Sequence, residues 1–180
     1  MLKNILIAVT VVVVVVVAVV AMQPTSYQVS RTATIAVPPA DVFVLVNDFH
    51  KWDNWSPWAK LDPGMKSTFD GAPSGTGAIN SWTGNDKVGE GRMTILESKP
   101  GELVRIKLEF VKPFASTSTS EFAFVGTASS TVVTWRMMGD NSFVEKGFCL
   151  FMGGMDKMIG PDFERGLAKL KTVTEAATRK

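Results

Sequence analysis

The sequence predicts an α+β domain preceded by one N-terminal transmembrane helix. Three observations lead there. Residues 5–22 are apolar and uncharged, six later stretches of alternating residues are separated by short turn-rich segments, and residues 155–177 carry apolar side chains at helical spacing. Short connections favour antiparallel hairpins. An antiparallel sheet with helices on one face is an α+β arrangement.

The composition limits what the domain can do. The chain has 180 residues, 46% hydrophobic and 20% charged, with 19 basic and 17 acidic side chains. This balance lacks the concentrated basic stripe of nucleic-acid binders, so no nucleic-acid partner is expected. A single cysteine, Cys149, and a single histidine, His50, exclude a disulfide framework and the common zinc sites. We expect no metal and no cofactor.

The N-terminal segment has the length of a membrane span. Residues 5–22 contain only one polar side chain, Thr10. As a helix they would measure ~27 Å, close to the ~30 Å hydrocarbon thickness of a bilayer. Pro24 then stops the helix. We therefore divide the chain into an anchor or signal segment, residues 1–23, and a domain, residues 24–180.

The basic residues around this segment predict its orientation. Lys3 and the amino terminus precede it, and no basic residue follows before Arg31. The positive-inside rule then places the N-terminus in the cytoplasm and the domain outside, as a single-pass protein of the cell membrane. The alternative is a cleaved signal peptide, with small residues at 19–21 before the cut, which would leave a secreted or periplasmic domain.

The domain begins with a strand and two short helices. Residues 27–37 alternate, with Val29 and Ile35 on one side, and two prolines end this strand. Asp41 and the apolar residues after it indicate a short helix. The aromatic residues 49–59 are expected to form a second one.

Six strands follow, of which the fourth is the clearest. There the apolar side chains from Val104 to Phe110 alternate with Arg105, Lys107 and Glu109, which is typical of a strand with one face in water. The six expected strands span residues 65–70, 77–83, 91–98, 103–111, 117–125 and 131–138.

A helix is expected at the C-terminus. Pro161 lies inside its pattern, so the helix either begins near Gly160 with the proline in its first turn or is a longer helix kinked there. The apolar stripe consists of Met155, Ile159, Phe163, Leu167, Leu170 and Val173.

Several strings in this order resemble one superfamily. They are VPPADVFVLVNDFHKWDNWSPW, GNDKVGEGRMTI, STVVTWRMMG and MIGPDFERGLAKLK. Residues 27–177 resemble the SRPBCC superfamily of START-like and polyketide cyclase/dehydrase-like domains, as a bacterial membrane-anchored member. The resemblance implies the helix-grip fold, a curved antiparallel sheet of about seven strands wrapped around a long C-terminal helix. It also implies a deep apolar pocket between them.

The candidate pocket lining consists of side chains on the inner side of the sheet and on the apolar stripe of the C-terminal helix. Trp135 shares its side with Val133 and Met137, and Trp82 shares its side with Asn80. Such side chains suit apolar ligands, although core packing explains each of them as well. The candidate ligand-binding residues are Trp82, Met93, Phe110, Phe122, Trp135, Met155 and Ile159.

Other residues have both a structural and a functional interpretation. Trp52, Trp55 and Trp58 recur every three residues. They could form a lid over the pocket or a belt at the membrane interface, but we favour the interpretation that they pack the short helices onto the sheet. His50, two residues after Asp48, is favoured as a surface histidine over a catalytic base.

The remaining strand carboxylates and the cysteine are expected to be structural. Glu97, Glu109 and Glu121 are expected to face solvent, and Cys149 to be a small buried hydrophobe.

We predict a protein that binds or carries an apolar small molecule or lipid outside the cytoplasmic membrane. No catalytic residue is assigned. The alternatives are a polyketide cyclase/aromatase-like enzyme, with Asn80, Ser118, Ser120 and His50 as candidates, and a non-catalytic envelope interaction module.

Overall fold

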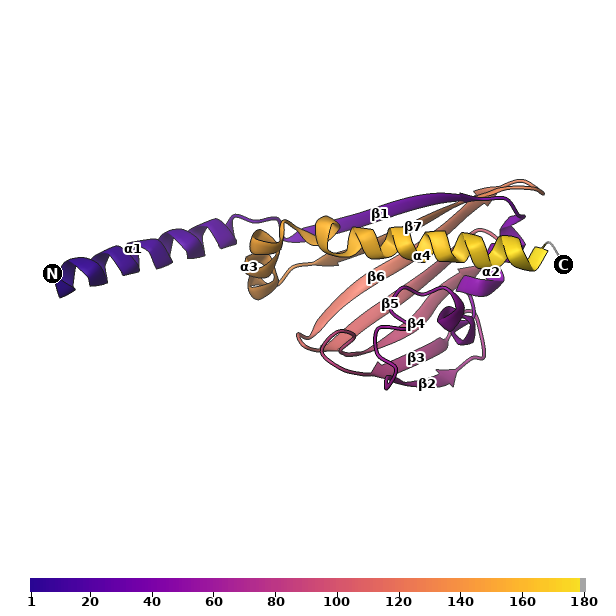
Figure 1. Cartoon of the computed structure of the whole chain (residues 1–180), viewed down its shortest axis with the longest axis horizontal. Coiled ribbons are helices and arrows are strands. Elements are labelled where there is room, and N and C mark those ends of the chain that lie inside the picture. Colours follow the sequence, from indigo (N-terminus) through magenta and orange to yellow (C-terminus); the bar gives the residue numbers. More distant parts are fainter. Residues whose placement is uncertain (179–180) are drawn as a thin grey trace.

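Seven antiparallel strands form one curved sheet along which the C-terminal helix lies (Figure 1). The structure is a computed structural model that describes residues 1–178. The strand order is β1-β7-β6-β5-β4-β3-β2. The strands are β1 Ser26–Ile35, β2 Lys66–Gly71, β3 Ala78–Thr83, β4 Glu90–Lys99, β5 Leu103–Lys112, β6 Ser116–Gly126 and β7 Thr131–Asp140. The α+β fold and all seven strands are as predicted.

The helices lie before, between and after the strands. They are α1 Leu2–Ala21, α2 Pro39–Val46, the 3-10 helix η1 Phe49–Asn54, α3 Phe143–Met152 and α4 Met155–Thr178. Within residues 1–178, α1 is the one helix long and apolar enough to cross a membrane, a test that an N-terminal signal sequence also passes. It projects away from the domain (Figure 1).

The helix α3 was not predicted. Ser142 and Glu145 form a capping box at its start, and Gly153 ends it in the left-handed conformation with a φ of 83°. The string Ser-Phe-Val-Glu before an apolar run carries this signal in the sequence. Cys149 lies on α3 and is half-buried, so the expectation of a buried cysteine is wrong. Partial burial raises the pKa of its thiol.

The long helix α4 continues through Pro161, as in the second of the two alternatives. Its buried face carries Phe163, Leu167 and Leu170. Gly166 allows close packing, because a Cβ there would lie 2.8 Å from the Trp135 ring and 3.1 Å from Pro57.

Gly166→Ala is expected to lower the free energy of unfolding by about 1–2 kcal/mol. The added methyl overpacks a contact with two rigid rings, and this cost exceeds the gain of ~1 kcal/mol in helix propensity. Gly147→Ala in α3 is the matched control, since its Cβ would lie 3.9 Å from Val20, an ordinary contact. Urea unfolding followed by circular dichroism measures both. Equal effects of the two substitutions would contradict the close-packing argument.

Arg31 holds α4 against the edge strand β1. Its Nη1 donates to Asp156 Oδ1 at 2.7 Å, and its Nε donates to Glu164 Oε1 at 2.7 Å. The hydrogen bond from Arg31 lowers the pKa of the Asp156 carboxyl from its ordinary value of 3.8.

The Arg31 contact predicts a pH-dependent stability. A carboxyl with a depressed folded pKa contributes fully above its unfolded pKa and loses that contribution as the pH falls through the folded one. Arg31→Met should therefore melt at a lower temperature than wild type at pH 7, and the difference should shrink below about pH 4. Thermal melts across this range test it. Arg165→Met, which removes a bond to Asp162 within α4, is the control.

The outer face of the sheet holds one unexpected buried carboxylate. Glu121 is 9% exposed and forms ion pairs with Arg105 at 3.1 Å and Arg136 at 3.3 Å. The expectation of solvent exposure is wrong for Glu121, because arginines from the neighbouring strands β5 and β7 cover it. Glu97 and Glu109 remain partly exposed.

Candidate functional site

A cavity of about 300 Å³ lies between the inner face of the sheet, η1 with the loop after it, and the first half of α4. Most of its wall is apolar. It is lined by Phe49, Trp52, Asp53, Ser56, Trp58, Ala59, Met65, Ser67, Asn80, Trp82, Lys87, Val88, Met93, Leu108, Phe110, Ser120, Trp135, Met137, Ile159 and Phe163.

One side of the cavity is built around Trp82 of β3. Its Nε1 donates to the Val88 carbonyl at 3.0 Å, and its ring meets Phe110 edge-on with centroids 5.9 Å apart. Gly91 on the neighbouring strand leaves room for the indole, since a Cβ there would lie 2.5 Å from it. The polar end of this tryptophan is thus satisfied, and its apolar face is free to line the cavity.

The other side is built around Trp135 of β7. Its ring stacks on Phe163 of α4 with centroids 4.0 Å apart and on Phe122 at 4.7 Å. Its Nε1 donates to Ser120 Oγ at 2.9 Å. Trp135 is 2% exposed, so it joins the sheet to the helix and presents little of its surface to the cavity.

The three regularly spaced tryptophans pack the short helices onto the sheet, as favoured. Trp52 Nε1 donates to the Val46 carbonyl at 2.9 Å, and Trp55 Nε1 donates to the Leu45 carbonyl at 3.1 Å. Both side chains are buried. Trp58 meets Trp135 edge-on at 5.8 Å. Trp52 and Trp58 also line the cavity, so packing and lining are combined here.

Few polar groups reach the cavity. Asn80 on β3 is 8% exposed, and its side chain has no hydrogen-bond partner among residues 1–178. Ser120 is buried beside Trp135. The titratable residues of the lining, Asp53 and Lys87, are both exposed at the rim. Among the described residues, the cavity therefore holds amide and hydroxyl groups but no buried acid or base.

The structure brings five of the seven candidate residues to the cavity wall: Trp82, Met93, Phe110, Trp135 and Ile159. Phe122 is fully buried behind Trp135, and Met155 packs against the core at the start of α4. Neither of these two lines the cavity. Sequence reasoning missed Leu108 and Met137, although alternation places them beside Phe110 and Trp135.

Two of the polar candidates lie elsewhere. His50 stacks on Phe69 of β2 at 4.2 Å, and its Nδ1 lies 2.9 Å from Asp48 Oδ1. Ser118 Oγ lies 2.7 Å from the Tyr27 hydroxyl. Neither residue lines the cavity.

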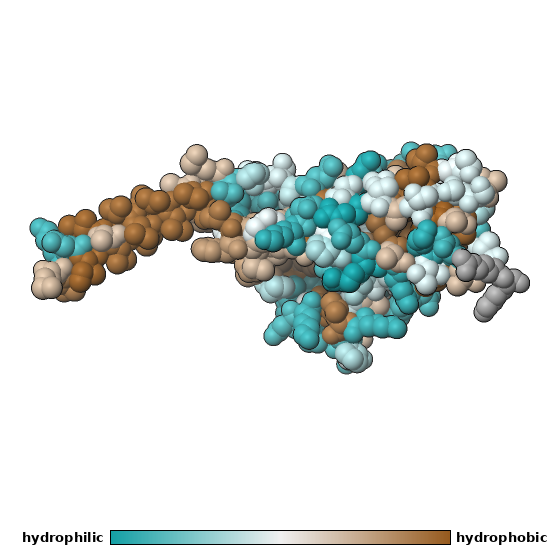
Figure 2. Space-filling view, turned by 45° about the horizontal axis from the view of Figure 1, so that its top comes forward, coloured by the Kyte–Doolittle hydropathy of each residue, from teal (hydrophilic) through white to brown (hydrophobic). Residues whose placement is uncertain are grey.

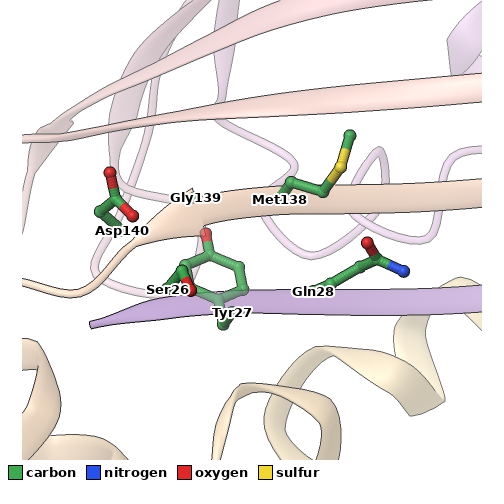
Figure 3. A pocket seen from close by; sticks show the side chains of 6 residues that line it. All are labelled: Ser26, Tyr27, Gln28, Met138, Gly139 and Asp140. Atoms are coloured by element: carbon green, nitrogen blue, oxygen red, sulfur yellow. The ribbon is translucent and has the colours of Figure 1, made fainter. Parts of the chain in front are cut away.

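A second, open hollow lies beside the start of β1 and the end of β7 (Figure 3). Its lining consists of Ser26, Tyr27, Gln28, Met138, Gly139 and Asp140. The Tyr27 ring lies over Gly139, where a Cβ would come within 2.8 Å of the hydroxyl. Partial burial raises the pKa of this tyrosine.

The fold and the cavity agree with the sequence comparison. Residues 26–175 match the family described as polyketide cyclase/dehydrase and lipid transport. The chain belongs to this family. The SRPBCC resemblance is therefore confirmed, and with it a ligand-binding helix-grip fold. No curated protein matches the chain in the sequence search.

Solved structures share the fold at low identity. The Zhui aromatase/cyclase of Streptomyces has a TM-score of 0.61 and 11% identity, covering 83% of this chain and 94% of its own. Norcoclaurine synthase of Thalictrum flavum has a TM-score of 0.61 and 12% identity, covering 85% and 96%. A protein of Thermobifida fusca has a TM-score of 0.58 and 21% identity, covering 82% and 92%.

Proposed function

We propose that this protein binds an apolar small molecule or lipid in the cavity between sheet and α4. The observation that carries the proposal is the cavity wall, which is mostly apolar and has Asp53 and Lys87 only at its exposed rim. Ligand sites are typically concave and apolar with a few placed polar groups. The family description, which includes lipid transport, supports the same function.

The cavity volume narrows the class of ligand. About 300 Å³ is the lower end of the range of roughly 300–1,000 Å³ for small-molecule sites. This size favours one ring system or one acyl chain over a two-chain lipid. The Asn80 amide, which has no hydrogen-bond partner among residues 1–178, favours a ligand with one hydroxyl or carbonyl group that it can bind.

We further propose that α1 anchors the domain, residues 24–180, at the outer face of the cytoplasmic membrane. The length and apolar character of α1 support a span. The cation before it, Lys3, supports a cytoplasmic N-terminus. Signal cleavage after α1 would instead release the domain into the periplasm or medium.

The test is to identify what the full chain carries. The chain is purified in an amphipathic polymer without added lipid, and solvent extracts are analysed by mass spectrometry. One apolar compound at near one molecule per chain would support the proposal. A chain that yields none and also takes up no apolar fluorescent probe would contradict it.

Asn80→Leu is expected to change ligand preference. Loss of one hydrogen bond should weaken binding of a long-chain alcohol about 2–10-fold. Binding of the matching hydrocarbon should weaken less than that of the alcohol, because leucine has the same branched arrangement of four side-chain heavy atoms as asparagine and no polar group. Competition with a fluorescent probe measures the ratio of the two affinities. A ratio equal to that of wild type would show that Asn80 does not contact the ligand.

The second candidate function is a polyketide cyclase-like reaction. It is favoured by the family description and by the amide and hydroxyl of Asn80 and Ser120 in the cavity wall. Recovery of the bound compound after incubation separates the two functions. An unchanged compound supports a binder, and a product with a new ring and one water fewer supports the enzyme.

A further inference from the structure

The helix α3 presents an apolar stripe to its surroundings. Val144, Phe148 and Phe151 are spaced i, i+4, i+7 and are 59%, 51% and 82% exposed. This spacing places the three side chains on one face of the helix. Large apolar side chains that are exposed side by side typically mark a site of interaction with a protein or a membrane, whereas single exposed ones do not.

The charged residues of α3 are used for contacts within the chain. Glu145 Oε2 accepts a hydrogen bond from the Ser142 backbone N–H at 2.7 Å. Lys146 Nζ donates to Thr25 Oγ1, in the segment between α1 and β1, at 3.0 Å. Both side chains therefore serve the helix start and the linker to α1, which leaves the exposed stripe without a charge.

The stripe is continuous with the surface of α1. The two helices are in contact, and Val20 near the end of α1 is buried to 5% exposure beside Gly147 of α3. Figure 2 shows the apolar surface of α1 reaching the near end of the domain. A bilayer that surrounds α1 would therefore meet α3 at the end of the span.

The cavity lies at this same end of the domain. The strand β1 begins four residues after Met22, and β7 ends at Asp140 just before α3. The strands β3, β5 and β7 run in the same direction, so they finish at the same end of the sheet. Trp82, Phe110 and Met137 lie near the last residues of these strands, so this part of the cavity wall is at the end of the sheet next to α3.

We propose that α3 lies in the interface of the bilayer that α1 spans. Val144, Phe148 and Phe151 insert among the acyl chains. The end of the domain that contains the cavity is then held at the membrane surface. Apolar ligands then reach the cavity from the bilayer without crossing bulk water. The inference rests on the proposed anchoring by α1.

Spin labels on the full chain test the position of α3. In a Cys149→Ser background, single cysteines replace Phe151, Val13 in α1, or Val125. The matched control is Val125, which is 71% exposed and apolar but lies near the last residue of β6, at the end of the sheet farthest from α3. The protein is reconstituted in vesicles of phosphatidylcholine and phosphatidylglycerol. Collisions with oxygen, which concentrates in lipid, and with a water-soluble nickel complex are then compared.

We expect the label at 151 to resemble that at 13, with more oxygen than nickel collisions, and the label at 125 to show the reverse. A label at 151 that resembles 125 would overturn the inference, while a lipid-exposed label at 13 would leave the anchor standing. A water-exposed label at 13 would overturn both. Broadening at 151 that disappears on dilution with unlabelled chain, without oxygen enrichment, would overturn it in favour of a second copy of the chain. Probe binding by the same variants reports on the cavity separately.

Discussion

Trp135→Ala is expected to lower the free energy of unfolding by about 3–5 kcal/mol. The indole is 2% exposed, and it stacks on both Phe163 and Phe122. Its removal leaves a cavity at the point where α4 meets the sheet, and Ser120 loses the donor that it accepts from. Because domains of this size are stable by about 5–15 kcal/mol, the loss is a large part of the total.

Denaturant unfolding of the full chain in detergent, followed by far-ultraviolet circular dichroism, measures this loss. Val132→Ala is the control, since Val132 lies on the same strand but is 39% exposed on the outer side. It should change the free energy of unfolding by about 0.5 kcal/mol or less. If both substitutions cost the same, Trp135 does not join the helix to the sheet as described.

Met93→Trp is expected to abolish ligand binding while the fold persists. Met93 is half-buried on β4 and lines the cavity, so a larger indole can occupy the space in which the ligand would lie. Competition between side chain and ligand should reduce affinity by at least about tenfold, equivalent to ~1.4 kcal/mol. Titration with an apolar fluorescent probe measures the affinity, and the melting temperature reports on folding.

Leu96→Trp is the matched control for this experiment. Leu96 lies on the same strand, is 50% exposed, and does not line the cavity. Its tryptophan variant should bind the probe as wild type does. A folded Met93→Trp variant that keeps full affinity would place the ligand elsewhere on the molecule and would contradict the proposed site.

Alternation along the strands was sufficient to find the inner face. The pattern from Val104 to Phe110 identified the wet and the apolar side of β5, and Trp135 was placed inward by its neighbours. Alternation says nothing about what covers that face. Phe122 and Met93 both lie on the inner face. Phe122 is covered by Trp52 and Trp55, whereas Met93 lines the cavity.

The pattern along one strand also could not predict contacts between side chains of neighbouring strands. The position of Glu121 in β6 predicts an outward carboxylate, and the side chain does lie on the outer face. Its burial depends on the register that places Arg105 and Arg136 beside it. The helix α3 was missed although Ser142 and Glu145 mark its start in the sequence. Its apolar face is exposed and does not pack on the core, so the pattern of core residues did not point to it.

The sequence by itself determined the apolar N-terminal helix, the seven strands, the C-terminal helix and the side of the sheet that faces inward. These follow from local periodicity, because each depends on residues within one element. Only the tertiary structure decided that five of the seven candidate residues border a cavity and that α3 lies beside α1. It also decided that the Asn80 side chain borders the cavity with no hydrogen-bond partner among the described residues. Such features depend on how close separate elements approach one another, which is decided by side-chain volumes and packing across the whole core.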